Sequence, residues 1–137
     1  MGGGHGEQDG PDEIDGVTID YAPDPDGDPD PGEVVWAWVP YEDDPNQGKD
    51  RPVLIIGRMG RQVAGVPLSS RDPADRRDGH EWVAVGAGGW DGERRPSWAD
   101  ATRLLRYDPA DVRREGDGLD RVRFDRVVQR VADLHDR

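Results

Sequence analysis

The sequence predicts a mainly β fold: a small β-barrel closed by one C-terminal helix. Several short segments between residues 33 and 107 are rich in β-branched and aromatic residues and are bounded by Gly, Pro or charged turns. The clearest helical pattern lies at the C-terminal end. With 137 residues, the chain has room for a single hydrophobic core. Short strands followed by one helix are typical of a small closed barrel.

Four strands are predicted from runs of apolar, β-branched or aromatic residues. They are expected at 33–39, 51–56, 62–68 and 81–85. The run 51–56 (RPVLII) is continuously apolar after its arginine, which is expected of a strand buried on both faces. A polar loop over 41–50 and a turn over 57–60 separate the first three strands, and a charged loop over 71–79 precedes the fourth.

The segment 101–107 fits either a strand or a helix. The four residues before it, 97–100 (SWAD), resemble a helix capping box. The Thr, Leu and Tyr content of the segment and its stop at Asp108-Pro109 favour a strand.

The C-terminal helix is predicted by apolar residues at positions i, i+3, i+4, i+7 and i+10, which share one helical face. They are Phe124, Val127, Val128, Val131 and Leu134. Asp120, which follows Gly118 closely, is the expected N-cap.

The negative charge is concentrated near the N-terminus. Residues 1–31 contain ten acidic residues and no Lys or Arg, in a chain with 30 acidic residues, 18 basic residues and a net charge of −12. The remaining residues are close to neutral, so the overall acidity does not argue against a nucleic-acid partner. Because residues 1–31 are also rich in Gly and Pro, we predict a disordered tail there and a barrel domain over 32–137. The alternating stretch 17–21 would add a strand if it docked.

Composition and motifs exclude several classes of site. No apolar run approaches the ~20 residues of a membrane span. The N-terminus lacks a secretory signal, so a cytoplasmic protein is expected. The absence of cysteine excludes disulfides and thiolate metal sites. His5, His80 and His135 are too scattered to bind a metal, and the glycine run 86–91 lacks the last Gly of a dinucleotide fingerprint. We therefore predict no metal ion and no cofactor.

Two residues at strand ends have the chemistry to act on a phosphate. Arg51 stands where the polar loop meets the second strand, so its backbone is fixed while its guanidinium can bind a phosphate and stabilise negative charge. Ser69 ends the third strand, where a fixed hydroxyl can donate to a phosphate oxygen. The alternatives are an ion pair of Arg51 with Asp50 or Glu33, and an ordinary turn serine at position 69.

Trp90 and Trp98 flank an arginine pair in the loop that precedes residue 97. Aromatic side chains beside Arg suit stacking with single-stranded nucleic acid. The alternative is that the two tryptophans pack this loop onto the barrel.

Six segments occur in an order and spacing that carry a family resemblance. They are 31–36 (PGEVVW), 46–56 (NQGKDRPVLII), 66–70 (VPLSS), 94–98 (RRPSW), 104–108 (LLRYD) and the predicted helix 120–134. Together they resemble the PemK/MazF family of toxin endoribonucleases over about residues 31–134. The resemblance is to actinobacterial-like members, and the acidic tail is longer than the few residues usual in the family.

The resemblance implies an SH3-like barrel, a homodimer, and the role of toxin in a type II toxin–antitoxin system. It implies an mRNA interferase that cleaves single-stranded RNA at specific sequences without a metal ion. In the implied reaction a ribose 2′-OH attacks its own 3′ phosphate and leaves a 2′,3′-cyclic phosphate. The implied partners are the RNA and a cognate antitoxin whose acidic tail occupies the RNA channel.

Residue by residue, the resemblance assigns two catalytic positions. Arg51 matches the arginine of the family's Arg-Pro motif, and Ser69 matches the Ser or Thr that ends the next strand. The substrate-binding residues expected beside them are Gln47, Gly48, Lys49, Ser70 and Arg71. The loops 71–79 and 86–96 depart from the family, and 113–116 (RREG) stands where a more apolar strand is usual.

Two questions stay open at this point. A barrel with a non-functional RNA channel would be a non-catalytic binding module, like the toxins of the same barrel family that bind DNA gyrase. The acidic tail either covers the RNA channel as an autoinhibitor or only keeps the protein soluble.

Overall fold

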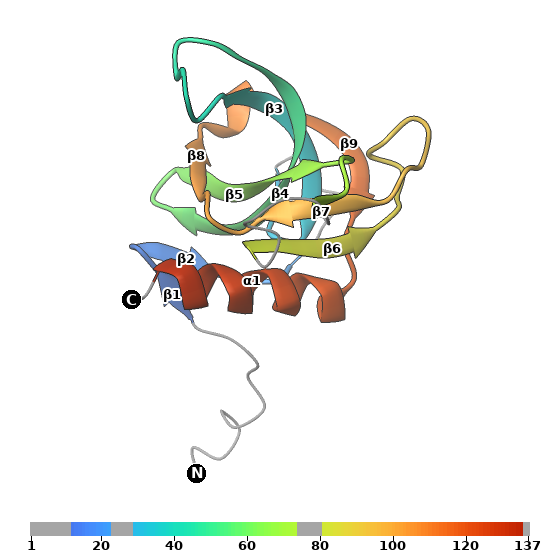
Figure 1. The fold of residues 1–137 in the computed structure, drawn as a ribbon. Helices are drawn as coiled ribbons and strands as arrows, with labels where there is room; N and C mark the ends of the chain where they lie inside the picture. Colours follow the sequence, from blue (N-terminus) through green and yellow to red (C-terminus); the bar gives the residue numbers. More distant parts are fainter. Residues whose placement is uncertain (1–11, 23–28, 74–80, 136–137) are drawn as a thin grey trace.

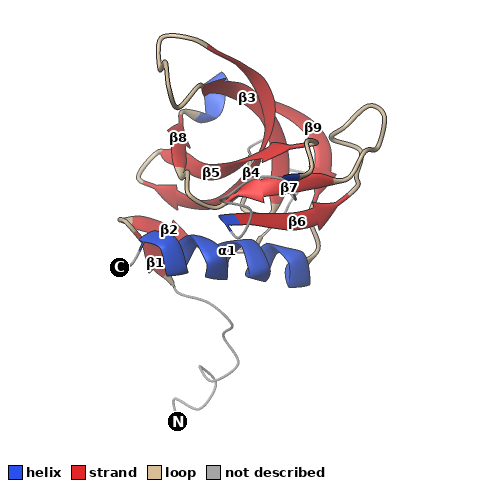
Figure 2. Ribbon diagram, in the orientation of Figure 1, coloured by secondary structure: helices blue, strands red, loops and turns tan. Residues whose placement is uncertain are grey.

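The computed structural model describes residues 12–22, 29–73 and 81–135 (Figure 1). A mostly antiparallel sheet curls into a half-barrel and one C-terminal helix covers it, which confirms the predicted fold class (Figure 2). Its elements are β1 (Glu13–Ile14), β2 (Val17–Ile19), β3 (Glu33–Pro40), β4 (Gly48–Met59), β5 (Gln62–Ser69), β6 (Trp82–Gly86), β7 (Ser97–Asp100), β8 (Leu105–Tyr107), the 3-10 helix η4 (Pro109–Asp111), β9 (Arg113–Gly118) and α1 (Arg121–His135). No helix of the described residues is long and apolar enough to cross a membrane.

The long strand β4 organises the sheet. The strand order is β1-β2-β4-β5-β7-β6, with β3 between β4 and β9, and β8 on β5. A bulge between Ile55 and Gly57 lets β4 bend while it pairs with β5. A Cβ on Gly57 would lie 2.3 Å from the carbonyl oxygen of Thr18, so glycine is required for β2 to pair there.

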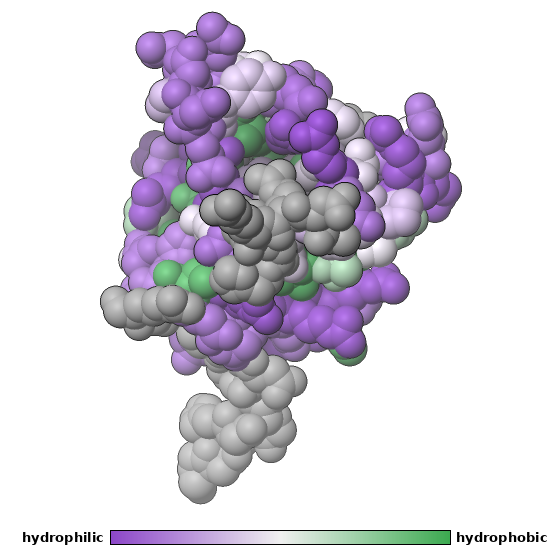
Figure 3. Space-filling view, viewed as in Figure 1, coloured by the Kyte–Doolittle hydropathy of each residue, from purple (hydrophilic) through white to green (hydrophobic). Residues whose placement is uncertain are grey.

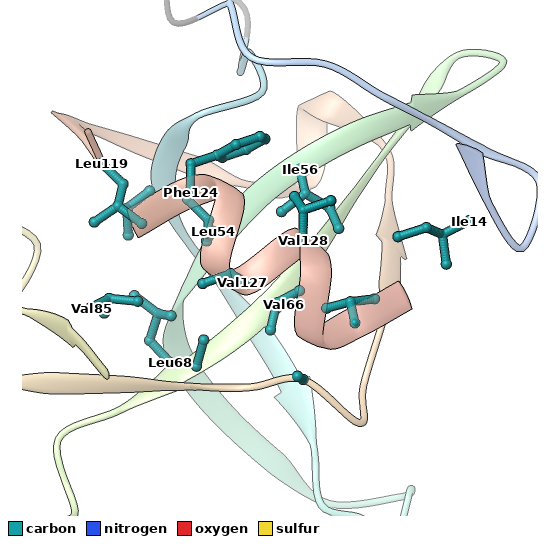
Figure 4. Close-up of a cluster of buried hydrophobic side chains, with 14 of the residues drawn as sticks. Ile14, Leu54, Ile56, Val66, Leu68, Val85, Leu119, Phe124, Val127 and Val128 are labelled. Carbon is teal, nitrogen blue, oxygen red and sulfur yellow. The ribbon is translucent and has the colours of Figure 1, made fainter. Parts of the chain in front are cut away.

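Helix α1 covers one face of the sheet with the apolar stripe that its sequence predicts (Figure 4). Asp120 caps it as expected, because the Arg123 backbone N–H donates to Asp120 Oδ2 at 3.1 Å. The helical residues buried in this first core are Phe124, Val127, Val128, Val131 and Ala132. Leu54 and Ile56 of β4 face them from the sheet.

A second core lies on the opposite face of β4. It contains Val35, Ala37, Val39, Val53, Ile55 and Val63. Because successive side chains of a strand point to opposite faces, Val53 and Ile55 enter this core while Leu54 and Ile56 enter the first. The continuous apolar run therefore is a strand buried on both faces, as predicted.

The four predicted strands are confirmed, with β4 starting earlier and ending later than expected. The turn predicted over 57–60 narrows to Gly60 and Arg61, and Gly60 has a φ of +61°. The capping-box interpretation of 97–100 is wrong, since these residues form β7 between β5 and β6. In the segment 101–107 only β8 is a strand, and the polar stretch at 113–116 lies in β9 and pairs with β3.

The prediction of a disordered tail is wrong for residues 12–22 and 29–31. Strands β1 and β2 form a hairpin whose two turn residues, Asp15 and Gly16, both have positive φ. Ile14 and Val17 are fully buried by this hairpin. Asp30 is buried too, and it pairs with Arg58. The predicted disorder of residues 1–11 and 23–28 lies outside the described residues.

This hairpin also bears on the autoinhibition hypothesis. It pairs with β4 at Gly57 and Arg58, whereas Arg51 lies in the other half of the strand. Asp15, one of the ten acids, has its Oδ2 3.1 Å from Nδ1 of His135 at the end of α1. Several of the tail's acids thus belong to the fold, away from Arg51.

Replacing Ile14 with alanine is expected to lower the free energy of unfolding by about 2 kcal/mol, because a buried branched side chain is truncated. Thr18→Ala, on the exposed side of the same hairpin, is the control and should change stability little. Urea unfolding of both variants measures the difference. Equal stability of Ile14→Ala and the unaltered protein would show that the hairpin contributes nothing to the fold.

Candidate active-site cleft

Arg51 and Ser69 are brought together by the pairing of β4 with β5. In this ladder Val53 pairs with Pro67 and Leu54 with Val66. Extending the same register by two residues places Arg51 level with Ser69. Strand alternation puts Arg51 on the same face as Val53, at the end of the second core.

The two residues line a cleft of about 850 Å³ at this end of the sheet. Its walls come from the end of β3 and the residues after it, the start of β4, the end of β5, and the region of β6 and β7. The basic side chains that line it are Lys49, Arg51, Arg71, Arg95 and Arg103. The acidic ones are Glu42, Asp43 and Asp100. The cleft therefore carries an excess of positive charge, in a chain whose net charge is −12.

Exposed hydrophobic surface is limited on the face of the molecule that Figure 3 draws. Figure 3 shows a face covered mainly by hydrophilic side chains, with hydrophobic ones only in small patches. Among the described residues the exposed large hydrophobic side chains are Trp38, Tyr41 and Val122, and of these Tyr41 lines the cleft. A polar cleft with an aromatic rim suits a charged ligand with flat rings.

The guanidinium of Arg51 is half-buried and makes no hydrogen bond or ion pair with a described residue. Burial is the main cause that lowers the pKa of Arg51; Tyr41 opposes this effect, and the charges of Arg103 and Arg71 add to it. Arginine nevertheless stays protonated in proteins. Arg51 is therefore a fixed positive charge whose donors are available to a ligand.

The alternative of a structural ion pair for Arg51 is not found. Asp50, its neighbour, pairs with Arg113 on β9, with Nη2 and Oδ2 3.0 Å apart. Glu33 is buried at the other end of β3, where its Oε1 accepts a hydrogen bond from the Asp30 backbone N–H at 3.3 Å.

Ser69 is a turn serine and at the same time a candidate hydrogen-bond donor to a phosphate. Its Oγ accepts a hydrogen bond from the backbone N–H of Arg71 at 3.1 Å, as a turn serine does. That bond fixes the oxygen and leaves the hydroxyl hydrogen free to donate into the cleft. Ser70 and Arg71 follow at the exposed rim.

Of the predicted substrate-binding residues, Lys49, Ser70 and Arg71 line the cleft, and Gln47 and Gly48 do not. The carbonyl of Gln47 accepts a hydrogen bond from the Tyr41 N–H at 2.8 Å and closes the loop before β4. A Cβ on Gly48 would lie 2.3 Å from the carbonyl oxygen of Val39. The structure therefore gives Gly48 a part in strand pairing.

Arg95 and Arg103 also line the cleft, although the sequence did not mark them as site residues. Arg95 Nε lies 2.9 Å from Oδ2 of Asp91, which is buried. A hydrogen bond from the Glu93 backbone N–H lowers the pKa of Asp91 most, burial raises it, and Arg95 lowers it further. The sequence indicated the arginine pair 94–95 as a candidate for nucleic-acid contact, but which of the two arginines lines the cleft depends on the geometry of the loop.

The stacking hypothesis is wrong for Trp90, which packs the loop instead. Its side chain is 3% exposed, and its Nε1–H donates to Ser97 Oγ at 3.1 Å. Its carbonyl accepts the Trp36 Nε1–H at 3.1 Å. Trp98 is half-buried on β7 and does not line the cleft.

Among the described residues no group of three or more His, Asp or Glu side chains is placed to hold a metal ion. The chemical resources of the cleft are fixed positive charges and hydroxyl donors. Such groups bind phosphates and stabilise negative charge that forms on them.

The family model of PemK-like, MazF-like toxins of type II toxin-antitoxin systems matches residues 30–135. Among solved structures, the chain is similar to an endoribonuclease from a mycobacterial species in complex with its cognate antitoxin, with a TM-score of 0.56 and 18% identity over 77% of this chain and 93% of that chain. It is similar also to a MazE–MazF structure from Deinococcus radiodurans, with a TM-score of 0.52 and 17% identity over 77% of this chain and 94% of that chain. At such identities the structural likeness shows the fold alone. No curated protein matches the chain.

Proposed function

The chain belongs to the PemK-like, MazF-like toxins of type II toxin-antitoxin systems, and we propose that it is an endoribonuclease that cuts single-stranded RNA in the cleft around Arg51 and Ser69. The observation that supports this most is the placement of a half-buried guanidinium, which pairs with no described residue, level with a hydroxyl held by a hydrogen bond, in a cleft with an excess of positive charge. The RNA backbone is the polyanion that such a cleft suits.

In the proposed reaction a ribose 2′-oxygen forms a bond to its own 3′ phosphorus while the bond from phosphorus to the 5′-oxygen breaks. The 2′-OH loses its proton and the leaving 5′-oxygen gains one, so the products are a 2′,3′-cyclic phosphate and a 5′-OH end. In the transition state between the intact RNA and these products, negative charge builds up on the phosphoryl oxygens. Arg51 stabilises this charge, because its backbone is held in β4 at the cleft and its guanidinium is partly shielded from water.

Ser69 donates a hydrogen bond to a phosphoryl oxygen in this scheme. Ser69→Ala is expected to slow cleavage on the order of 10- to 100-fold, the effect of losing one hydrogen bond to a charged group. Ser69→Thr keeps the hydroxyl and should retain most of the activity. Single-turnover cleavage of a labelled RNA measures both rates. Equal loss in the two variants would mean that the hydroxyl is not what the position supplies.

Family membership also supports proposals on partners. The mycobacterial endoribonuclease was solved with its cognate antitoxin, and the Deinococcus structure is of MazE with MazF. We expect this chain to have a cognate antitoxin, to form a homodimer and to act in the cytoplasm, where messenger RNA is translated.

The test is cleavage of a long mixed-sequence RNA by the purified protein in EDTA. The expected result is a small number of cuts, with 5′-OH ends that a kinase labels without prior phosphatase treatment. Intact RNA, with the protein shown to be folded, would contradict the proposal. It would favour the alternative of a barrel that binds a partner without cutting RNA.

A further inference from the structure

A second, smaller cleft adjoins the proposed active site. It has a volume of about 140 Å³, and Arg51, Ser69 and Arg95 line both clefts. Its other walls include Trp36, Asp91 and Ser97. A water molecule occupies ~30 Å³ in the liquid, so the small cleft has the capacity of a few waters or one flat ring.

The loop that forms the far wall of this small cleft is held from several sides. Trp90 is buried beneath it and is hydrogen-bonded at both its Nε1 and its carbonyl oxygen. Asp91 accepts the Glu93 N–H at 2.9 Å and binds the Arg95 side chain. The Arg94 N–H donates to the Asp91 carbonyl at 2.8 Å. Arg95 is therefore positioned before any ligand arrives.

Two neighbouring arginines of this loop line different hollows. Arg95 lines the two clefts around Arg51, whereas Arg94 lines a separate hollow with Arg123. Arg94 has a φ of +53°, in the left-handed region of the backbone. The loop thus presents one arginine to the active site and the next to another surface.

The small cleft has the chemistry that recognises a single base. Trp36 supplies an aromatic wall, and stacking on such a wall binds any base. Arg95 uses Nε and, at 3.5 Å, Nη2 toward Asp91, so other guanidinium N–H groups remain to donate. Hydrogen bonds of this kind at the edge of a base distinguish one base from another.

We propose that the small cleft binds the nucleobase next to the scissile phosphate, and that Arg95 determines which base is accepted. This inference rests on the proposed function for the identity of the ligand. Trp36 contributes affinity without selectivity, and Asp91 is a positioning residue that acts through Arg95. The shared walls at Arg51 and Ser69 bring this base and the reacting phosphate side by side.

The test uses a random-sequence RNA pool with 2′-fluoro riboses, which has no nucleophile and cannot be cut. The pool is sequenced before and after selection by the unaltered protein, by Arg95→Ala and by Arg94→Ala. We expect the unaltered protein to select particular bases at several positions of the RNA. Arg95→Ala should lose this base preference at one position and keep it at the others. Arg94→Ala removes the same charge from the same loop and should leave every preference unchanged.

Three results would overturn the inference. In the first, the unaltered protein selects RNA with no base preference. In the second, Arg95→Ala keeps the base preference of the unaltered protein. In the third, Arg95→Ala binds all sequences more weakly by the same factor, which is the behaviour expected of a phosphate contact. Thermal unfolding and circular dichroism of both variants are recorded as well, and the selection is run below the unfolding transition of the less stable one, so that a disrupted loop is recognised. Arg95→Gln, which keeps hydrogen-bond donors toward Asp91, is included for the same reason. Cleavage in EDTA is scored separately, so that failure of the nuclease proposal is told apart from failure of the base subsite.

Discussion

Replacing Arg51 with alanine is expected to slow RNA cleavage by a factor of about 10²–10³, the usual effect of removing one donor that stabilises charge in a transition state. The side chain has no described partner whose release would compensate, and its burial strengthens its interaction with a phosphate. Its loss should leave the fold intact, since the residue ends the second core without belonging to it. Single-turnover rates at saturating RNA measure the effect.

Arg51→Lys distinguishes the contribution of the guanidinium geometry of Arg51 from that of its charge, and a second substitution serves as the control. Arg51→Lys keeps the charge but loses the planar fork of donors, so a rate between those of alanine and arginine is expected. Arg61→Ala, in the exposed turn at the far end of the same strand pair, should cleave as the unaltered protein does. Cleavage by Arg51→Ala at the full rate would remove Arg51 from the reaction.

The convergence of the two catalytic candidates was open to prediction from the sequence. Both positions lie near the ends of strands predicted to be neighbours, so an antiparallel hairpin brings them close together. The bulge between Ile55 and Gly57 then sets the exact register, because the pairing next to the turn, continued without the bulge, would put Arg51 level with Ser70. The second face of β4 was also predictable, because a continuous apolar run has no solvated side. Local pattern sufficed in these cases because the relevant contacts lie between strands that are neighbours in the chain.

The stretch 17–21 was expected to add a strand if it docked, and β2 confirms this. Its hairpin partner β1 was missed, although the turn between the two strands has a strong local signal. Asp15-Gly16 between Ile14 and Val17 is the turn sequence that two-residue hairpins prefer. The disorder prediction was based on the average composition of residues 1–31, and the many acidic residues and glycines in that segment outweighed the short apolar pattern around the turn. The stability of the hairpin depends on β4 and α1, which lie far away in the sequence, so its two apolar residues are buried by partners that no local window contains.

The arginines of the cleft could not be identified from sequence pattern, because the pattern does not show toward which surface a loop side chain is directed. Arg94 and Arg95 are identical in type and adjacent, yet they line different hollows, and the backbone of Arg94 has a positive φ that no sequence pattern indicated. Arg103 follows β7 in a turn, and it enters the cleft because β7 pairs with β5 at Ser69. β7 itself was obscured by polar residues that are buried through tertiary contacts.

The largest effect on stability is expected from Phe124→Ala, which should lower the free energy of unfolding by about 3–5 kcal/mol. Phe124 is 2% exposed, and its ring lies edge-on to Tyr21 with centroids 5.0 Å apart. Truncation leaves a cavity between the helix and the sheet, and the surrounding structure closes such cavities only in part. Val122→Ala is the matched control on the same helix, because Val122 is 62% exposed and should change stability little.

The same substitution tests whether the two faces of β4 act independently. Phe124 belongs to the core beneath α1, whereas Arg51 continues the opposite face, so the cleavage rate per folded molecule should stay unchanged below the unfolding transition. Phe124→Leu retains most of the buried volume and provides a measurable variant if the alanine form does not fold. Urea unfolding and cleavage are then measured on one preparation. A cleavage rate that falls in proportion to stability, with the protein still folded, would show that the helix face and the cleft are coupled through β4.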